Sequence, residues 1–125
     1  SLSLEERITY HPAENIFYIN FENYRVQNSD DVRDIEEAVV NILLPLGKKV
    51  FAIVNYDNFI IYPEIIDEYT AMVQRLMDNY YTGVTRYTTS TFLRMKLGDA
   101  LQKRNVAPHI YETREEAQIA LGKTA

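Results

Sequence analysis

The chain has 125 residues, of which 46% are hydrophobic and 25% are charged, proportions typical of one folded domain rather than of two domains or a disordered segment. Its formal net charge of −5 argues against nucleic acid and an anionic membrane surface as partners. The chain contains no cysteine, which excludes disulfides, thiolate metal sites and a cysteine nucleophile, and fits a reducing cytoplasm.

A membrane-spanning helix needs about 18 consecutive apolar residues, and no apolar stretch of this sequence is nearly that long. Residues 1–7 also lack the basic and apolar regions of a secretion signal. We therefore expect no membrane partner and a cytoplasmic location. The chain starts with Ser1 instead of Met, which is consistent with methionine removal, with a tag remnant or with excision from a longer polypeptide.

The N-terminal part predicts a β-hairpin. A β-branched and aromatic run at residues 16–21 is separated from residues 7–10 by a turn-rich link. Phe17, Ile19 and Phe21 occupy alternate positions of the second strand, so we expect them to be buried on one face.

A helix is expected next. Asn28 or Ser29 can cap its start, and Gly47 is a suitable residue to end it. Its apolar residues recur at helical spacing: Val32, Ile35, Val39, Ile42, Leu43 and Leu46.

The middle of the chain predicts a strand, a helix and another strand. Residues 50–54 form a continuous apolar run, the pattern of a central strand covered on both faces in a parallel sheet. Pro63 opens the predicted helix, and Gly83 is expected to break it before a strand at residues 84–89. The apolar face of that helix comprises Ile65, Ile66, Tyr69, Met72, Val73, Leu76 and Tyr80.

The C-terminal part predicts a helix, a short strand at residues 109–112 and a last helix with Thr113 and Glu116 as its capping box. Ser90 or Thr91 can cap the first of these helices. Its expected apolar face comprises Phe92, Leu93, Met95, Leu97, Ala100 and Leu101. The resulting order, β-β-α-β-α-β-α-β-α, predicts an α/β fold with a mostly parallel central sheet and helices packed on it. It resembles the STAS fold of anti-sigma-factor antagonists.

Two loops form the candidate ligand site, because ligands of open α/β sheets bind beyond the carboxyl ends of the strands. At the second loop, the N–H groups and hydroxyls at a helix start could hold a phosphate or carboxylate, and Arg86 and Arg94 could add charge. The remaining candidates are Asn55, Tyr56, Asp57 and Asn58 in the first loop and Thr88, Thr89 and Ser90 in the second. Helix caps and polar connections are the simpler interpretation, and we favour it over an anion site.

No catalytic constellation can be assembled from the sequence. His11 and His109 are far apart and lack metal-ligand spacing, and no Gly-x-Ser-x-Gly motif marks a serine nucleophile. The four glycines are isolated, which excludes a phosphate-binding loop and a dinucleotide fingerprint. We expect no catalytic residue, no metal site and no cofactor.

Five segments carry a resemblance to a known family: residues 5–10, 17–22, 54–59, 84–98 and 107–112. Together they resemble the C-terminal extension of acyl-CoA:acetate/3-ketoacid CoA-transferases, the propionate CoA-transferase-like group. The most distinctive segment reads VTRYTTSTFLRMKLG, and the resemblance covers nearly the whole chain. It implies that residues 1–125 are one STAS-like domain, excised from or homologous to the C-terminal part of a larger bacterial transferase.

The resemblance also implies what the chain lacks. In that family a glutamate of the preceding catalytic domains forms the thioester with CoA, and no glutamate of this chain matches it. Antagonists of the STAS fold are switched by phosphorylation of a serine at the start of the helix after the central strand. Residues 58–63 contain no serine or threonine, so this switch cannot be transferred.

These observations leave three hypotheses about function. The leading one is a non-catalytic accessory domain that packs on the catalytic domains of a CoA-transferase or on a second copy of itself, with CoA or acyl contact as a further role. The alternative is a stand-alone STAS-like module that binds a small anionic or acyl ligand at the two loops. An independent small enzyme is the least favoured of the three.

Overall fold

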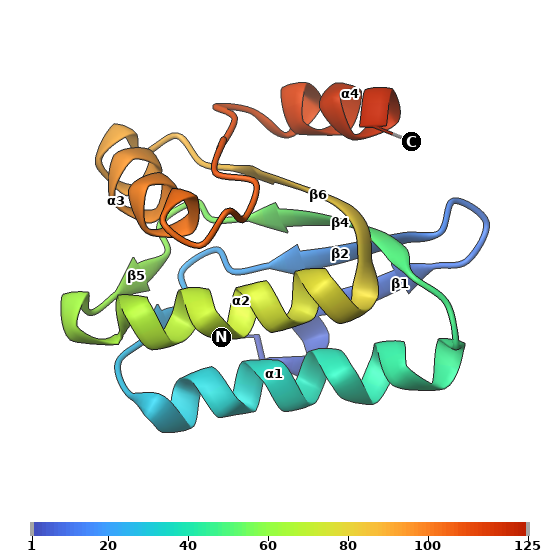
Figure 1. Ribbon diagram of the computed structural model, residues 1–125, viewed down its shortest axis with the longest axis horizontal. Coiled ribbons are helices and arrows are strands. Elements are labelled where there is room, and N and C mark those ends of the chain that lie inside the picture. Colours follow the sequence, from blue (N-terminus) through green and yellow to red (C-terminus); the bar gives the residue numbers. More distant parts are fainter. Residues whose placement is uncertain (1, 125) are drawn as a thin grey trace.

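A four-stranded, mostly parallel sheet forms the centre of the computed structural model, which describes residues 2–124 (Figure 1). Its strands are β1 (Ile8–His11), β2 (Ile16–Asn20), β4 (Val50–Asn55) and β6 (Tyr81–Tyr87), in the spatial order β1-β2-β4-β6. β1 runs antiparallel to β2, whereas β2 and β6 both run parallel to β4. The predicted α/β class with a mostly parallel sheet is therefore confirmed.

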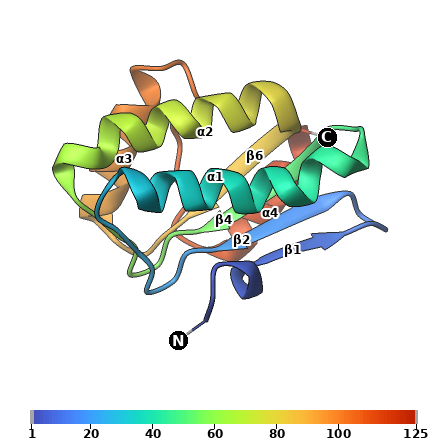
Figure 2. The same cartoon turned by 90° about the horizontal axis from the view of Figure 1, so that it is seen from below.

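Helices cover both faces of this sheet to different extents. The helices of the described range are α1 (Ser29–Leu43), α2 (Ile66–Tyr80), α3 (Thr91–Gln102) and α4 (Arg114–Thr124). α1 and α2 lie side by side on one face, and α4 lies on the other (Figures 1 and 2). The smaller elements are the 3-10 turns η1 (Glu5–Arg7), η2 (Leu44–Leu46) and η3 (Pro63–Ile65) and a two-stranded parallel sheet of β3 (Arg25–Val26) and β5 (Ile60–Ile61).

The hairpin and its buried face follow the prediction. Ile8 pairs with Ile19 and Tyr10 with Phe17 across β1 and β2. Phe17, Ile19 and Phe21 are all buried, because alternate residues of β2 face α1 and α2. This face of the sheet and the apolar stripes of the two helices form the core.

The first helix also follows its sequence signals. The Asn28 side chain accepts a hydrogen bond from the Asp31 N–H at 3.0 Å, which satisfies one of the free donors at the helix start. Val32, Ile35 and Val39 are buried on the inner side of α1. The chain leaves the η2 turn through Gly47, whose φ of 65° suits glycine better than any residue with a side chain.

The predicted central strand is confirmed as well. Residues 50–54 all lie in β4, which has a parallel neighbour on each side. Val50, Ala52, Ile53 and Val54 are buried, so both faces of this strand are covered.

The boundary between α2 and β6 differs from the prediction. α2 ends at Tyr80 and β6 begins at the next residue, so Gly83 lies inside the strand and does not break the helix. Pairing with β4 explains the shift, because Val50 pairs with Tyr81, whose side chain is buried. Residues 88 and 89, expected in this strand, lie beyond its end at Tyr87.

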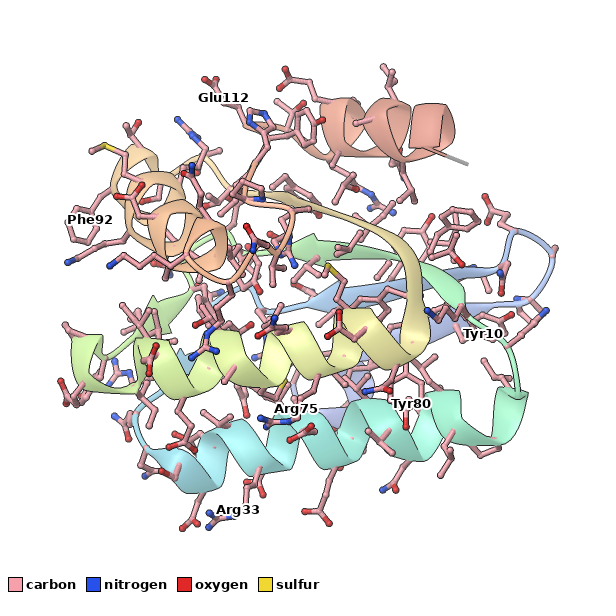
Figure 3. The ribbon with its side chains drawn as sticks, viewed as in Figure 1. Tyr10, Arg33, Arg75, Tyr80, Phe92 and Glu112 are labelled. Atoms are coloured by element: carbon pink, nitrogen blue, oxygen red, sulfur yellow. The ribbon has the colours of Figure 1, made fainter. Side chains whose placement is uncertain are left out.

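The expected apolar face of α3 is only partly correct. Leu93, Leu97 and Leu101, spaced four residues apart, are buried against the core. Phe92 and Met95 are 72% and 65% exposed, because helical spacing places them on the side of α3 opposite to the three leucines. Figure 3 shows Phe92 pointing away from the rest of the molecule. The predicted face was therefore too wide.

The expected final strand at residues 109–112 is reduced to one bridge between Tyr87 and Tyr111. The Tyr111 N–H donates to the Arg86 carbonyl at 2.8 Å, and the Tyr111 carbonyl accepts from the Thr88 N–H at 2.9 Å. The chain then turns into the capping box of α4, in which the Thr113 hydroxyl accepts from the Glu116 N–H at 3.2 Å.

The second face of the sheet is only half covered. α4 packs on β4 and β6, where the Thr85 hydroxyl donates to the Ala117 carbonyl at 2.9 Å. No helix of the described residues covers the same face of β1 and β2 (Figures 1 and 2). This uncovered half of the sheet carries the candidate site.

Candidate functional site

The two loops singled out in the sequence do come together. Asp57, after β4, accepts hydrogen bonds through Oδ1 from the Thr89 N–H at 2.7 Å and from the Thr89 hydroxyl at 3.1 Å. The donors expected to hold an external anion therefore hold an internal carboxylate. This arrangement fits the simpler interpretation of the loops as connections that fasten to each other.

The other candidates of the second loop are also engaged. The Ser90 hydroxyl caps α3 by accepting from the Leu93 N–H at 3.1 Å. The buried Thr88 hydroxyl accepts from the Ser90 N–H at 3.2 Å. Arg94 donates to the Thr88 carbonyl at 2.6 Å and lies 3.7 Å from a carboxylate oxygen of Glu112. These contacts organise the start of α3.

Two further candidates, Tyr56 and Arg86, lie in the core and not at the surface, with exposed fractions of 2% and 1%. Asn58 adopts the left-handed conformation with φ of 52°, and its side-chain amide donates to Asn23. Of the nine candidates, only Asn55 lines the open cavity on the half-covered face of the sheet.

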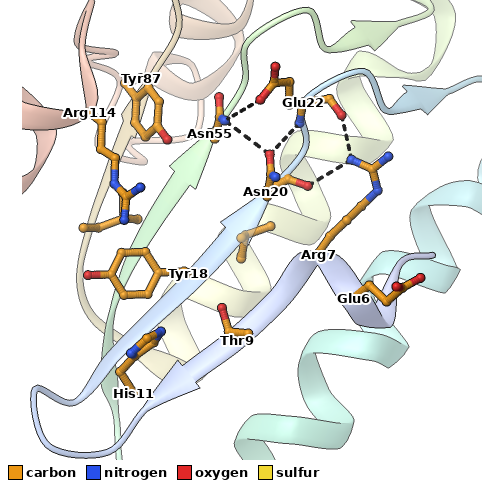
Figure 4. Close-up of a pocket in the computed structure, with 12 residues that line it drawn as sticks. Glu6, Arg7, Thr9, His11, Tyr18, Asn20, Glu22, Asn55, Tyr87 and Arg114 are labelled. Carbon is orange, nitrogen blue, oxygen red and sulfur yellow. Dashed lines mark hydrogen bonds between the residues drawn. The ribbon is translucent and has the colours of Figure 1, made fainter. Parts of the chain in front are cut away.

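That cavity has a volume of about 430 Å³ and lies over β1, β2 and the ends of β4 and β6 (Figure 4). Strand register explains its lining, because Thr9, Tyr18 and Ile53 form one row across the sheet, and Asn20, Asn55 and Tyr87 form the next. We call these residues, with the others that line the cavity, the open-face site. The others are Glu6, Arg7, His11, Ile19, Glu22 and Arg114.

One side of the open-face site is a rigid polar network. The Arg7 guanidinium donates to the carbonyls of Asn20 at 3.1 Å and Glu22 at 2.7 Å. The Asn20 side-chain oxygen accepts from the Glu22 N–H at 3.0 Å and from the Asn55 amide at 3.2 Å (Figure 4). Arg7 is 6% exposed, so its role is to hold the segment after β2 in place.

The other side presents a cation and aromatic rings. The guanidinium carbon of Arg114 lies 5.5 Å from the centroid of the Tyr18 ring, a cation–π distance (Figure 4). The His11 ring meets Tyr18 edge to face at 4.8 Å. Arg114 forms no ion pair within the described residues. Partial burial raises the pKa of Tyr87, and the charge of Arg114 offsets part of that rise.

An apolar groove continues from the open-face site. It has a volume of about 350 Å³ and shares Tyr18 and Ile53 with the open-face site. Its remaining lining consists of Glu14, Ile16, Phe51, Gln118, Leu121 and Gly122. The uncovered half of the sheet therefore has a polar end with an unpaired cation and an apolar end beside α4.

The chemical groups at the open-face site are those of a polar binding surface. No group of metal-ligating side chains occurs among residues 2–124, and no helix there is long and apolar enough to cross a membrane. His11 and His109 make ring contacts with tyrosines. The arrangement provides hydroxyls, amides, the carboxylates of Glu6 and Glu22 and the guanidinium of Arg114, which can hydrogen-bond to a polar or charged group.

Most of the open-face site was missed in the sequence. Tyr18 and Asn20 occupy the alternate positions to the buried residues of β2, so the period-two pattern alone assigns them to the opposite face. Arg114 and Tyr87 give no such signal, because the position of Arg114 beside Tyr18 depends on the packing of α4, and that of Tyr87 depends on the pairing of β6 with β4.

Comparisons of the chain with protein-family models, curated proteins and solved structures found no match.

Proposed function

We propose that the chain is a non-catalytic interaction domain of an acyl-CoA:acetate/3-ketoacid CoA-transferase, and that the open-face site is its contact surface. The resemblance of residues 84–98 and of the other segments to the C-terminal extension of these enzymes supports the family. A STAS-like fold is part of the same proposal, supported by the order of strands and helices. The partner is the catalytic part of the transferase or a second copy of the chain.

The observation that carries this proposal is the uneven coverage of the sheet. An α/β sheet is stable when helices cover both faces, and here α4 covers only β4 and β6. Tyr18 of β2 and Arg114 at the start of α4, which both line the open-face site, belong to the residue types that are enriched in protein interfaces. A partner on this half would complete the second face.

Sedimentation of the purified chain, alone and mixed with the catalytic domains of a propionate CoA-transferase-like enzyme, tests the proposal. We expect association in one of the two experiments. Tyr18→Ala and Arg114→Ala should each weaken it by about tenfold or more in Kd, about 1.4 kcal/mol, because they remove the central aromatic and cationic side chains. Arg33→Ala, on the outer side of α1 (Figure 3), is the matched control for charge.

Two results would contradict the proposal. One is that the chain stays monomeric both alone and in the mixture. The other is association that Arg33→Ala weakens as much as Arg114→Ala does, because a contact through the open-face site leaves the outer side of α1 free.

A second function, binding of a small anionic or acyl ligand, is favoured by the two-part character of the same surface. A carboxylate or phosphate group suits the Arg114 end, and an acyl chain suits the groove lined by Ile16, Phe51 and Leu121. Fatty acids, acyl-CoA thioesters and inorganic phosphate are the probes, and the melting temperature is the measurement. A ligand at a hundred times its Kd adds about 2.7 kcal/mol to stability. Unchanged melting with every probe would exclude this function.

A further inference from the structure

Arg86 carries a positive charge into the core. Its side chain is 1% exposed and projects from β6 on the same face as Val54, its pairing partner, toward α1 and α2. One Nη1 hydrogen bond goes to the Ala107 carbonyl at 2.7 Å. Arg86 forms no ion pair within the described residues, and its Nε has no hydrogen-bond partner there.

A second donor without an acceptor lies in the same region. The hydroxyls of Tyr56 and Tyr69 are 2.7 Å apart and both side chains are buried. Burial raises the pKa of both phenols, so each keeps its hydrogen at neutral pH. Two hydroxyl hydrogens share one hydrogen bond, which leaves the second hydrogen without an acceptor in the described residues.

The three residues that carry these donors line one small internal cavity. It has a volume of about 20 Å³, and Arg86, Tyr56 and Tyr69 are among its lining residues. The rest of the lining is apolar apart from Tyr81, so the wall supplies no carboxylate or amide oxygen, and no hydrogen bond from Arg86 Nε to a tyrosine oxygen forms in the described residues. A cavity of this size accommodates about one water molecule.

We propose that this cavity is a binding site for a single hydrogen-bond acceptor of about the size of a water molecule, either water itself or a halide ion. The acceptor would receive hydrogen bonds from Arg86 Nε and from the free tyrosine hydroxyl. A buried N–H or O–H without a partner is strongly disfavoured, and native proteins usually satisfy such groups with an internal water. The guanidinium charge adds an electrostatic preference for a halide, and the small volume favours water.

The bound water or halide ion would connect three parts of the chain that are distant in the sequence. Arg86 belongs to β6, Tyr56 follows β4 and Tyr69 lies in α2. Arg86 also holds the segment before α4 through Ala107. The proposed site therefore joins the sheet to α2 beneath the helix layer, and it lies on the opposite face of the sheet from the open-face site.

High-resolution crystal structures of the full chain, from crystals soaked in sodium chloride and in sodium bromide, test the proposal. A density peak within hydrogen-bond distance of Arg86 Nε supports it. If water occupies the cavity, the peak in the bromide-soaked crystal shows no anomalous signal. If a halide occupies it, bromide gives an anomalous signal at the same position. A cavity with no peak in either crystal would overturn the proposal.

Variants provide the second test. Arg86→Met keeps most of the side-chain length but removes the guanidinium, and we expect the peak to vanish. Should this variant fail to fold, Tyr69→Phe and Tyr56→Phe each remove one hydroxyl without changing the ring. If Tyr69 is the donor to the bound acceptor, the peak should disappear or shift in Tyr69→Phe, and if Tyr56 is the donor, it should do so in Tyr56→Phe. A peak unchanged in both variants would contradict the assigned donors.

Discussion

Four asparagines take left-handed backbone conformations at the ends of elements: Asn15, Asn23, Asn58 and Asn105, with φ between 52° and 59°. Asparagine tolerates this region better than other residues with side chains, since its short polar side chain can bond locally. In Asn58 and Asn15 the side chain does bond, to Asn23 and to the Lys49 carbonyl. The Asn105 side chain forms no hydrogen bond with the residues that the structure describes, so its conformation can be tested in isolation.

Replacement of Asn105 should separate backbone strain from side-chain contacts. We expect Asn105→Ala to lower the free energy of unfolding by about 1 kcal/mol, because alanine is disfavoured in the left-handed region. Asn105→Gly should leave it within about 0.5 kcal/mol, because glycine has no Cβ. Denaturant unfolding of the two variants measures the difference, and equal stabilities would show that this turn is not constrained.

The buried tyrosines predict instability at alkaline pH. Burial raises the pKa of Tyr56, Tyr69 and Tyr81, whereas unfolded tyrosines ionise near about pH 10. Above that pH the folded chain retains more protons than the unfolded chain, so the free energy of unfolding falls as pH rises. The slope contributed by each tyrosine is at most about 1.4 kcal/mol per pH unit.

Unfolding in urea at increasing alkaline pH measures this loss. Tyr81→Phe should reduce the slope, whereas Tyr62→Phe, at an exposed tyrosine, serves as the control. If both variants had the wild-type slope, Tyr81 would not contribute to the alkaline loss.

At the scale of elements, single side chains connect loops and helices that are distant in the sequence. Asp57 fastens the loop after β4 to the loop after β6. Glu36 of α1 receives two hydrogen bonds from Arg75 of α2, at 2.9 and 2.8 Å (Figure 3). Both contacts lie near the surface, but Asp57 binds a backbone N–H, whereas Glu36 binds a long side chain that loses conformational freedom on pairing.

Asp57→Ala should destabilise the chain by about 1–2 kcal/mol, because it removes a charged acceptor from the Thr89 N–H and hydroxyl. Asp57→Asn keeps an acceptor oxygen and should cost less. Thermal unfolding of both variants gives the comparison. If the alanine variant were as stable as the wild type, the contact between the loops would make no net contribution.

Glu36→Gln should cost less than about 1 kcal/mol at neutral pH, because the Arg75 side chain is half exposed to solvent. The hydrogen bonds from Arg75 lower the pKa of Glu36. Its contribution is therefore complete above the unfolded pKa and is lost as the pH falls through the lower folded value. The difference from wild type in urea unfolding should vanish in acid. Glu37→Gln, at an exposed glutamate without a hydrogen bond or ion pair in the described residues, is the control.

At the scale of the whole molecule, burial distinguishes side chains that look alike in the sequence. Phe17 is fully buried between the sheet and the helices, whereas Phe92 is 72% exposed. We expect Phe17→Ala to lower the free energy of unfolding by about 3–5 kcal/mol, and Phe92→Ala to change it by about 0.5 kcal/mol or less. Chemical denaturation checks both. A large loss in Phe92→Ala would mean that α3 packs differently.

The periodicity of the sequence was sufficient for the hairpin, for α1 and for the central strand β4, because each has a regular apolar pattern and a local start or stop signal. It failed at Gly83, which lies in a strand, and at Phe92 and Met95, which are exposed. In both places strand pairing or helix orientation, set by distant residues, decided the outcome.

The sequence by itself determined the order of the four helices and of strands β1, β2, β4 and β6, the caps of α1, α3 and α4, and the buried face of β2, since these depend on residues close together in the chain. Only the tertiary structure decided that Asp57 takes the donors of Thr89, that Arg86 lies in the core and that α4 leaves β1 and β2 uncovered. Those features depend on contacts between elements, and a pattern within one segment carries no information about which neighbour will cover it.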